Sequence, residues 1–193
     1  MDSVNVSLRE AFGEKLVKIG EENDKVIVLD ADVSASTRSS HFRERFPKRF
    51  LNVGISEQDM IGIAAGLAIE GFIPVATGFS MFLLRAWEQI RNTISRDNLN
   101  VKIVATHAGL SDYADGSSHQ CLEDIALMRI LPKMNVVVPS DPVSVRSLLE
   151  QIIGLRGPCY MRIGRDYSPK VYDTEDDVVF GKPNILGEGE DVT

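Results

Sequence analysis

The 193-residue chain has only two cysteines and one tryptophan, no excess of positive charge and no long apolar run. Cys121 and Cys159 stand apart among apolar residues without metal-ligand spacing, which predicts two reduced core thiols. With 28 acidic against 21 basic residues the net charge is −7, which argues against nucleic acid as the main partner. No apolar run approaches the length of a membrane span, and no apolar signal region opens the chain. We therefore expect a cytoplasmic protein that binds neither nucleic acid nor membranes.

Short apolar runs rich in β-branched residues alternate with segments of helical periodicity. The runs predict buried strands at residues 25–30, 72–76, 101–106, 135–138 and 159–163. The periodic segments predict helices at residues 57–70, 82–94, 122–130 and 141–153, after a first helix capped by Ser7 and ending at Gly20. Such alternation predicts an α/β fold with a doubly wound, mainly parallel sheet, whose ligands lie beyond the carboxyl ends of the strands.

Glu57 places a carboxylate at the start of a predicted helix, because Ser56 is a suitable N-cap and Asp59 a suitable third residue. Alone, this pattern indicates an acid that complements the helix dipole, worth at most about 1 kcal/mol. Residues 61–68, however, are small and apolar all round, which predicts a deeply buried helix with the carboxylate near the core. A desolvated glutamic acid holds its proton more firmly and can share it with a basic ligand atom.

Aromatic side chains and histidines follow the next two strands. Phe79, Phe82 and Arg85 recur at helical spacing, which usually indicates core packing. Beside a buried carboxylate, the same aromatics offer the surface that a flat heteroaromatic ligand requires. His107 and His119 share a Gly/Ser-rich loop; their spacing does not indicate a metal site, but their place at the ligand-binding edge indicates proton transfer or oxyanion contact.

Arg165 follows the last predicted strand and has two readings. A guanidinium at this edge can hold a phosphate through two hydrogen bonds, or it can form a surface ion pair with the adjacent Asp166. The sequence leaves both open.

Taken in order, these segments resemble the pyrimidine-binding domain of transketolase-like thiamine-diphosphate enzymes from about Ser7 to Arg165. The resemblance rests on Gly54-Ile55-Ser56-Glu57-Gln58, on Phe79 with Phe82, and on Asp115-Gly116-Ser117-Ser118-His119-Gln120. It is nearest to the C-terminal subunit of a split transketolase, whose two halves are separate chains. It implies a pyrimidine-binding (Pyr) domain over residues 1–170 and an acidic linker, residues 171–193, towards a further C-terminal domain.

The resemblance also implies a role for each matching residue. Glu57 is expected to hydrogen-bond the N1′ atom of the aminopyrimidine, which favours the 4′-imino form and removal of the C2 proton. His119 is expected to face the sugar donor and His107 the acceptor, both as catalytic residues. The other expected cofactor-binding residues are Asp32, Phe79, Phe82 and Arg85. The expected substrate-binding residues are Arg9, Ser36 and Arg165 around the sugar phosphate, Asp115 at a donor hydroxyl, and His119.

Two departures from the family pattern bear on function. Arg85 stands where many transketolases have tyrosine, and residues 85–89 are closer to deoxyxylulose-phosphate synthase, which leaves the donor open. The sequence contains no Gly-Asp-Gly segment followed by Asn-Asn, the family's binding segment for Mg²⁺ and the diphosphate. We therefore expect Mg²⁺ and diphosphate mainly on an N-terminal partner subunit, and no activity without it. Self-association is also expected, because Phe79, Phe82 and Ile61 would otherwise be exposed.

Other functions stay open at this point. Within the class they are deoxyxylulose-phosphate synthase and the β-type subunit of a 2-oxo-acid dehydrogenase. Outside it is a non-catalytic phospho-acceptor or ligand-binding module, because Asp30 and Asp32 at a strand end suit a receiver domain. That reading leaves Glu57 and the histidine loop unexplained. A Rossmann dinucleotide site is not indicated, because no Gly-x-Gly-x-x-Gly follows a predicted strand.

Overall fold

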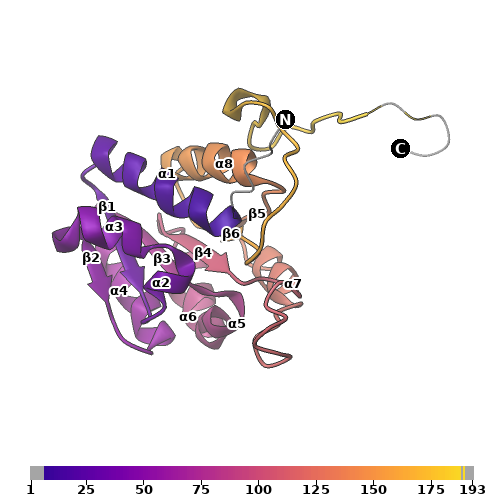
Figure 1. Cartoon of the computed structure of the whole chain (residues 1–193). Coiled ribbons are helices and arrows are strands. Elements are labelled where there is room, and N and C mark those ends of the chain that lie inside the picture. The colour runs from indigo at the N-terminus through magenta and orange to yellow at the C-terminus, as the bar shows by residue number, and fades with distance from the viewer. Residues whose placement is uncertain (1–6, 188, 190–193) are drawn as a thin grey trace.

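A computed structural model describes residues 7–187 and 189, which form a six-stranded parallel sheet with helices on both faces (Figure 1). The strand order is β2-β1-β3-β4-β6-β5, and every neighbouring pair is parallel. This confirms the doubly wound α/β prediction. The strands are β1 Val26–Asp30, β2 Phe50–Asn52, β3 Ile73–Phe79, β4 Lys102–Thr106, β5 Asn135–Val137 and β6 Cys159–Arg162. All five predicted strands are present, and β2 is additional.

Two hydrophobic layers sandwich the sheet, because successive residues of a strand face opposite sides. In β1, Val28 packs in the layer with α1 and α8, whereas Leu29 packs in the layer with α4 and α7. Figure 1 shows α1 and α8 lying together over one face. The helices are α1 Leu8–Glu22, α2 Ser34–Thr37, α3 Ser40–Arg45, α4 Glu57–Ile69, α5 Ser80–Leu83, α6 Trp87–Gln89, α7 Asp124–Arg129 and α8 Pro142–Gly154. Among the described residues, no helix combines the length and apolarity needed to cross a membrane.

Two predicted helices differ from expectation. Ser7 caps the first helix as predicted, since its hydroxyl accepts from the Glu10 amide, but the helix continues through Gly20 to Glu22. Gly20 is required for packing instead, because a Cβ there would lie 2.4 Å from the Phe42 ring. The helix predicted at residues 82–94 is broken into α5, a 3₁₀ turn, α6 and a π-helical turn over residues 90–95. Such irregular turns within helices are frequent at functional sites.

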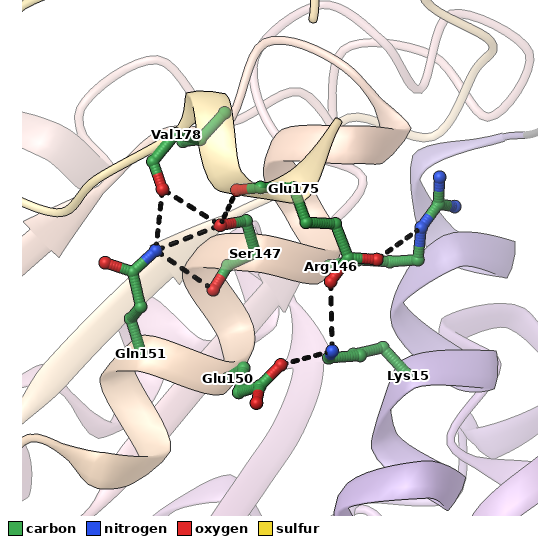
Figure 2. A network of polar contacts seen from close by, with 7 residues as sticks. All are labelled: Lys15, Arg146, Ser147, Glu150, Gln151, Glu175 and Val178. Atoms are coloured by element: carbon green, nitrogen blue, oxygen red, sulfur yellow. Dashed lines mark hydrogen bonds and ion pairs between the residues drawn. The ribbon is translucent and has the colours of Figure 1, made fainter. Parts of the chain in front are cut away.

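Residues 171–180, here called the C-terminal strap, lie against α8 and α1 (Figure 2). Ser147 donates its hydroxyl to the carbonyls of Glu175 and Val178 at 2.7 and 2.9 Å, and the Gln151 amide reaches Val178 at 2.8 Å. From α1, Lys15 pairs with the Glu175 carboxylate at 3.0 Å. The segment predicted as a linker is therefore held on the domain over these residues. Its path towards a further domain stays a prediction.

Asp141, the N-cap of α8, also binds the strap. Its Oδ1 accepts from the Ser144 amide at 2.7 Å, and its Oδ2 accepts from the amides of Val171 and Tyr172 at 2.8 and 3.0 Å. Burial opposes ionisation of this carboxyl, but the hydrogen bonds outweigh burial and lower its pKa.

We expect Asp141→Ala to lower the free energy of unfolding by about 2 kcal/mol at neutral pH, measured by urea denaturation. A carboxyl whose pKa is lowered by folding stabilises the protein above its unfolded pKa of about 3.9, and this contribution disappears as the pH falls through the folded pKa. The difference between variant and wild type should therefore shrink below about pH 4. Asp173→Ala, at a residue with a 93% exposed side chain, is the matched control. An equal loss in both variants would contradict the assignment.

Candidate active site

The strand order places the predicted site residues along one edge of the sheet. Glu57 follows β2, Asp32 follows β1, and Phe79 ends β3. Next along the same edge come His107 after β4 and Arg165 after β6. The chain leaves β1 for β2 on one side and then returns to β3 on the other, so the order reverses between β1 and β3. Ligands of open α/β sheets bind at such a reversal.

Glu57 is the first residue of α4 and only 4% of its surface is exposed. Ser56 does not cap the helix as expected; its hydroxyl donates to the Val53 carbonyl at 2.9 Å. Among the described residues, the Glu57 carboxylate has no hydrogen-bond partner, yet neither of its oxygens is a fully buried atom left unpaired. Most of the side chain is therefore buried while the carboxylate itself keeps some contact with solvent. It is free to accept a hydrogen bond from a ligand.

The helix behind Glu57 is not buried all round, contrary to expectation. Met60 and Ile61 are fully buried, but Gly62 and Gly66 are exposed, with nothing within 4 Å of an added Cβ. On this side Ile69 is 70% exposed. The small residues of α4 therefore leave one open face rather than serving close packing inside this chain.

The rings of Phe79, Phe82, His107 and His119, here called the aromatic cluster, lie against one another. The ring of Phe79 lies between those of His107 and Phe82, with centroid distances of 3.7 and 5.0 Å. The rings of His119 and Phe82 form a T-shaped pair with a centroid distance of 5.3 Å. The structure thus joins the phenylalanine pair to both histidines, which the sequence had placed only in the same region.

His107 is held neutral in a left-handed backbone conformation, with φ at 55°. Burial, together with the charges of Arg9 and Arg165, lowers the pKa of its imidazole to about 3. Its Nε2 lies 3.3 Å from Arg9 Nη1 and its Nδ1 lies 2.8 Å from the Thr106 hydroxyl. Because a guanidinium only donates, Nε2 is the acceptor and Nδ1 carries the proton. A neutral ring suits a hydrogen-bonding role better than proton donation at neutral pH.

The His107 imidazole should therefore stay neutral in the folded chain from about pH 8 to pH 5. The pH dependence of its ring signals in NMR measures this. An unfolded histidine takes up a proton near pH 6.5. A histidine kept neutral by folding consequently makes the chain less stable as the pH falls below that value. Arg9→Met removes one of the charges facing His107 and should raise its pKa. A wild-type midpoint close to that of an unfolded histidine would contradict the assignment.

Three residues predicted to clamp a sugar phosphate lie together. Arg9 donates through Nε to the Arg165 carbonyl at 2.9 Å and through Nη1 to the Ser36 carbonyl at 2.6 Å. Arg9, Arg38 and Arg165 contribute to the wall of a surface cavity of about 230 Å³. The Arg165 guanidinium pairs with Asp112 at 2.6 Å, not with Asp166 as the second reading had it. The same wall also carries Glu10, Glu14 and Asp166, and Arg38 pairs with Glu10 at 3.0 Å, so an anion entering here would meet charges of both signs.

The remaining predicted residues lie around this group. Asp115 approaches Arg165 to 3.7 Å. Asp32 has a left-handed backbone, φ 66°, and its carboxylate accepts from the Asn52 amide at 2.9 Å. The Arg85 side chain is exposed, and the contact to the Glu57 region is made by its backbone carbonyl, which accepts from Gln58 at 3.2 Å.

Asp30 has a structural environment that does not suit a phospho-acceptor. It is fully buried, and its Oδ1 accepts from the Val33 amide at 2.7 Å. Its Oδ2 accepts from the hydroxyls of Thr77 and Ser39 at 2.8 and 3.0 Å. Phosphorylation would have to break these bonds, so the receiver-type reading loses its support at this residue.

The sequence reasoning missed a buried polar group behind the aromatic cluster. Asp124 is fully buried and accepts from the hydroxyls of Ser80 and Tyr160 and from Arg162. An arginine flanked by apolar residues in a buried strand was the available signal, because such a charge requires a partner. Among the described residues, no group of three or more potential ligands could hold a metal ion.

Comparison with known proteins agrees with this arrangement. The family model for the pyrimidine-binding domain of transketolase matches residues 4–170. A protein of Methanocaldococcus jannaschii named as a transketolase C-terminal section is 45% identical over 100% of this chain and 62% of its own length. A 6-deoxy-6-sulfo-D-fructose transketolase subunit of a Clostridium species is 34% identical over 96% of this chain and 58% of its own length. The chain therefore spans about three fifths of these relatives.

The fold comparison gives the same result. A solved structure described as "Split gene transketolase, inactive beta4 tetramer" superposes with a TM-score of 0.85 at 47% identity, covering 97% of this chain and 61% of that one. A transketolase of Pichia stipitis, at 22% identity and a TM-score of 0.80, shares the fold over 89% of this chain and 28% of its own. The chain belongs to the transketolase pyrimidine-binding domain family.

Proposed function

We propose that this chain is the pyrimidine-domain subunit of a thiamine-diphosphate-dependent transketolase, which transfers a two-carbon ketol unit between sugar phosphates. The observation that carries the proposal is Glu57, a buried residue at a helix start whose carboxylate has no hydrogen-bond partner among the described residues. It shares the sheet edge with the aromatic cluster. A protonatable ring nitrogen would supply the missing partner, and an aromatic wall suits a flat ring.

The residues present fit the pyrimidine half of the cofactor. When bound, thiamine diphosphate supplies a nucleophilic carbon and an electron sink for the two-carbon unit. Glu57 would hold the ring nitrogen N1′ and share a proton with it. Phe82 would pack against the ring, and Phe79, which is stacked on Phe82 and His107, would support Phe82. Arg9 and Arg165 would bind the phosphate of the sugar, and both already line one cavity.

A partner chain would supply the other half of the site. The sequence lacks the Gly-Asp-Gly…Asn-Asn segment, so we assign Mg²⁺ and the diphosphate to an N-terminal subunit and expect no activity without it. The relatives named as a transketolase C-terminal section and as a transketolase subunit support a divided enzyme.

Reconstitution tests this function directly. The chain, mixed with its partner, cofactor, Mg²⁺, ribose 5-phosphate and xylulose 5-phosphate, should form sedoheptulose 7-phosphate. Either chain alone should not. Consumption of pyruvate as the only donor would overturn the transketolase assignment in favour of deoxyxylulose-phosphate synthase or a 2-oxo-acid dehydrogenase, the first of which the Arg85 segment resembles.

We further propose that the isolated chain self-associates, and that the open face of α4 is part of the contact. Of the three residues first expected to drive association, Ile61 is fully buried and Phe79 is only 8% exposed, whereas Phe82 is partly exposed. Beside and within α4, the exposed apolar side chains include Ile55 and Ile69, at 79% and 70%. Support comes from the 47% identical relative described as a beta4 tetramer.

Gly66→Arg should leave the chain folded, because nothing lies within 4 Å of the added Cβ and glycine is the poorer helix former. It should shift the sedimentation coefficient towards that of a monomer. Gly154→Arg, an equally open position at the end of α8, is the matched control and should sediment like wild type. Unchanged association of the Gly66 variant would exclude this face.

A further inference from the structure

A buried polar network lies directly behind the aromatic cluster. Asp124 Oδ2 accepts from the Ser80 hydroxyl at 3.0 Å, from the Tyr160 hydroxyl at 2.9 Å and from Arg162 Nε at 2.9 Å. The two hydroxyls are 2.9 Å apart. Three of the four residues are fully buried, and the Arg162 side chain is 20% exposed. The network therefore joins α5, α7 and β6 in the interior.

One end of this network reaches the phenylalanine wall. Ser80 follows Phe79 directly and begins α5, which carries Phe82. Fixing the Ser80 hydroxyl on Asp124 therefore fixes the turn that presents both rings. A buried carboxylate with all its donors in place favours a single arrangement of the groups around it, because any other leaves a polar atom unpaired.

The other end reaches the loop that carries His119, residues 107–121. Arg162 lies against Gly109, where a Cβ would be 2.8 Å from Nη2. Gly109 and Cys121 exchange two backbone hydrogen bonds, of 2.8 and 3.1 Å, which close the base of this loop. Cys121 in turn stands three residues before Asp124. The same carboxylate is thus connected to both sides of the aromatic cluster.

We propose that Asp124, Ser80, Tyr160 and Arg162 form a positioning network that sets the distance between the phenylalanine pair and the two histidines. The four residues touch no predicted ligand position themselves and act through Phe79 and His119. A merely stabilising role would be filled as well by apolar residues of similar volume. The connection to both walls of the site is what distinguishes the network from such packing.

The three histidines provide the test on the full isolated chain. His107 stacks on Phe79 at 3.7 Å, so its ring signals respond to small displacements, whereas His41 on α3 serves as an internal reference. In NMR spectra of the histidine-labelled chain, Tyr160→Phe should shift the signals of His107 and His119 and leave those of His41. Tyr172→Phe, the same change outside the network, should shift none of them.

The catalytic consequence rests on the proposed function and has its own measurement. In the reconstituted enzyme, Tyr160→Phe should lower kcat/KM about tenfold, since small misplacements of site residues are costly, and Tyr172→Phe should not. If the signals of His107 and His119 are unchanged in Tyr160→Phe, the positioning role is refuted, even if the unfolding temperature of the variant falls. If Tyr160→Phe does not fold, Ser80→Ala is judged by the same signals. A wild-type mixture without transketolase activity would refute the proposed function and leave the NMR result valid.

Discussion

In the enzyme assembled from this chain and its partner, Glu57→Gln should slow exchange of the cofactor's C2 proton by about 10²–10⁴-fold, a typical contribution of acid–base catalysis. Glutamine has nearly the same shape but cannot take or give a proton at its amide. The exchange rate is measured by NMR after transfer into deuterated water.

The folded chain should tolerate this substitution. The Glu57 carboxylate has no hydrogen-bond partner among the described residues, so replacing it by the similarly shaped glutamine breaks no internal hydrogen bond there. The unfolding temperature of Glu57→Gln should accordingly be close to that of wild type. Asp59→Asn is the matched control, because it makes the same chemical change in the same helical turn at an exposed residue. Wild-type exchange in the Glu57 variant would refute the role assigned to this glutamate.

The second large effect is expected at Asp30. Its substitution by alanine should lower the free energy of unfolding by about 3 kcal/mol, because the Val33 amide and the hydroxyls of Thr77 and Ser39 would lose their common acceptor inside the protein. Burial raises the pKa of this carboxyl although the hydrogen bonds to it act in the opposite direction. Part of the loss is therefore offset by removing a poorly solvated group.

Urea denaturation of the isolated chain measures the Asp30 effect. Asp24→Ala, at a fully exposed carboxylate just before β1, is the control and should change stability by at most about 0.5 kcal/mol. The larger loss should be accompanied by disorder around α2, whose Thr37 hydroxyl also contacts Asp30 at 3.2 Å. If Asp30→Ala lowers the free energy of unfolding no more than Asp24→Ala does, water has replaced the carboxylate as the hydrogen-bond acceptor.

The alternation of strands and helices could be predicted from the sequence because its strongest signals are local. Apolar β-branched runs identified five strands within a few residues of their ends, and the order of the motifs gave the edge on which the site lies. The missed strand, Phe50–Asn52, has only three residues, of which one is buried. Its strand character comes from pairing with β1, which no local pattern encodes.

The site was foreseeable as a set of residues but not as a set of contacts. The pattern of α4 predicted burial correctly for Ile61 and wrongly for Gly66, since small residues can face a partner as well as a core. The stacking of His107 on Phe79 and the partner of Arg165 depend on long-range geometry. For the same reason Arg162 in its apolar strand could indicate that a buried partner exists, but not that this partner is Asp124, which as a helix-start acid resembles Glu57.

The C-terminal strap has a consequence for the order in which the chain folds. Lys15 and Glu175 meet across 160 residues, and Ser147 and Gln151 can receive the strap only once α8 is in place. Its contacts close a large loop, which is an entropic cost that favours late formation. Contacts made after the transition state slow unfolding without accelerating folding. The strap should therefore increase kinetic stability: it slows unfolding and so prolongs the lifetime of a domain that has already assembled its site.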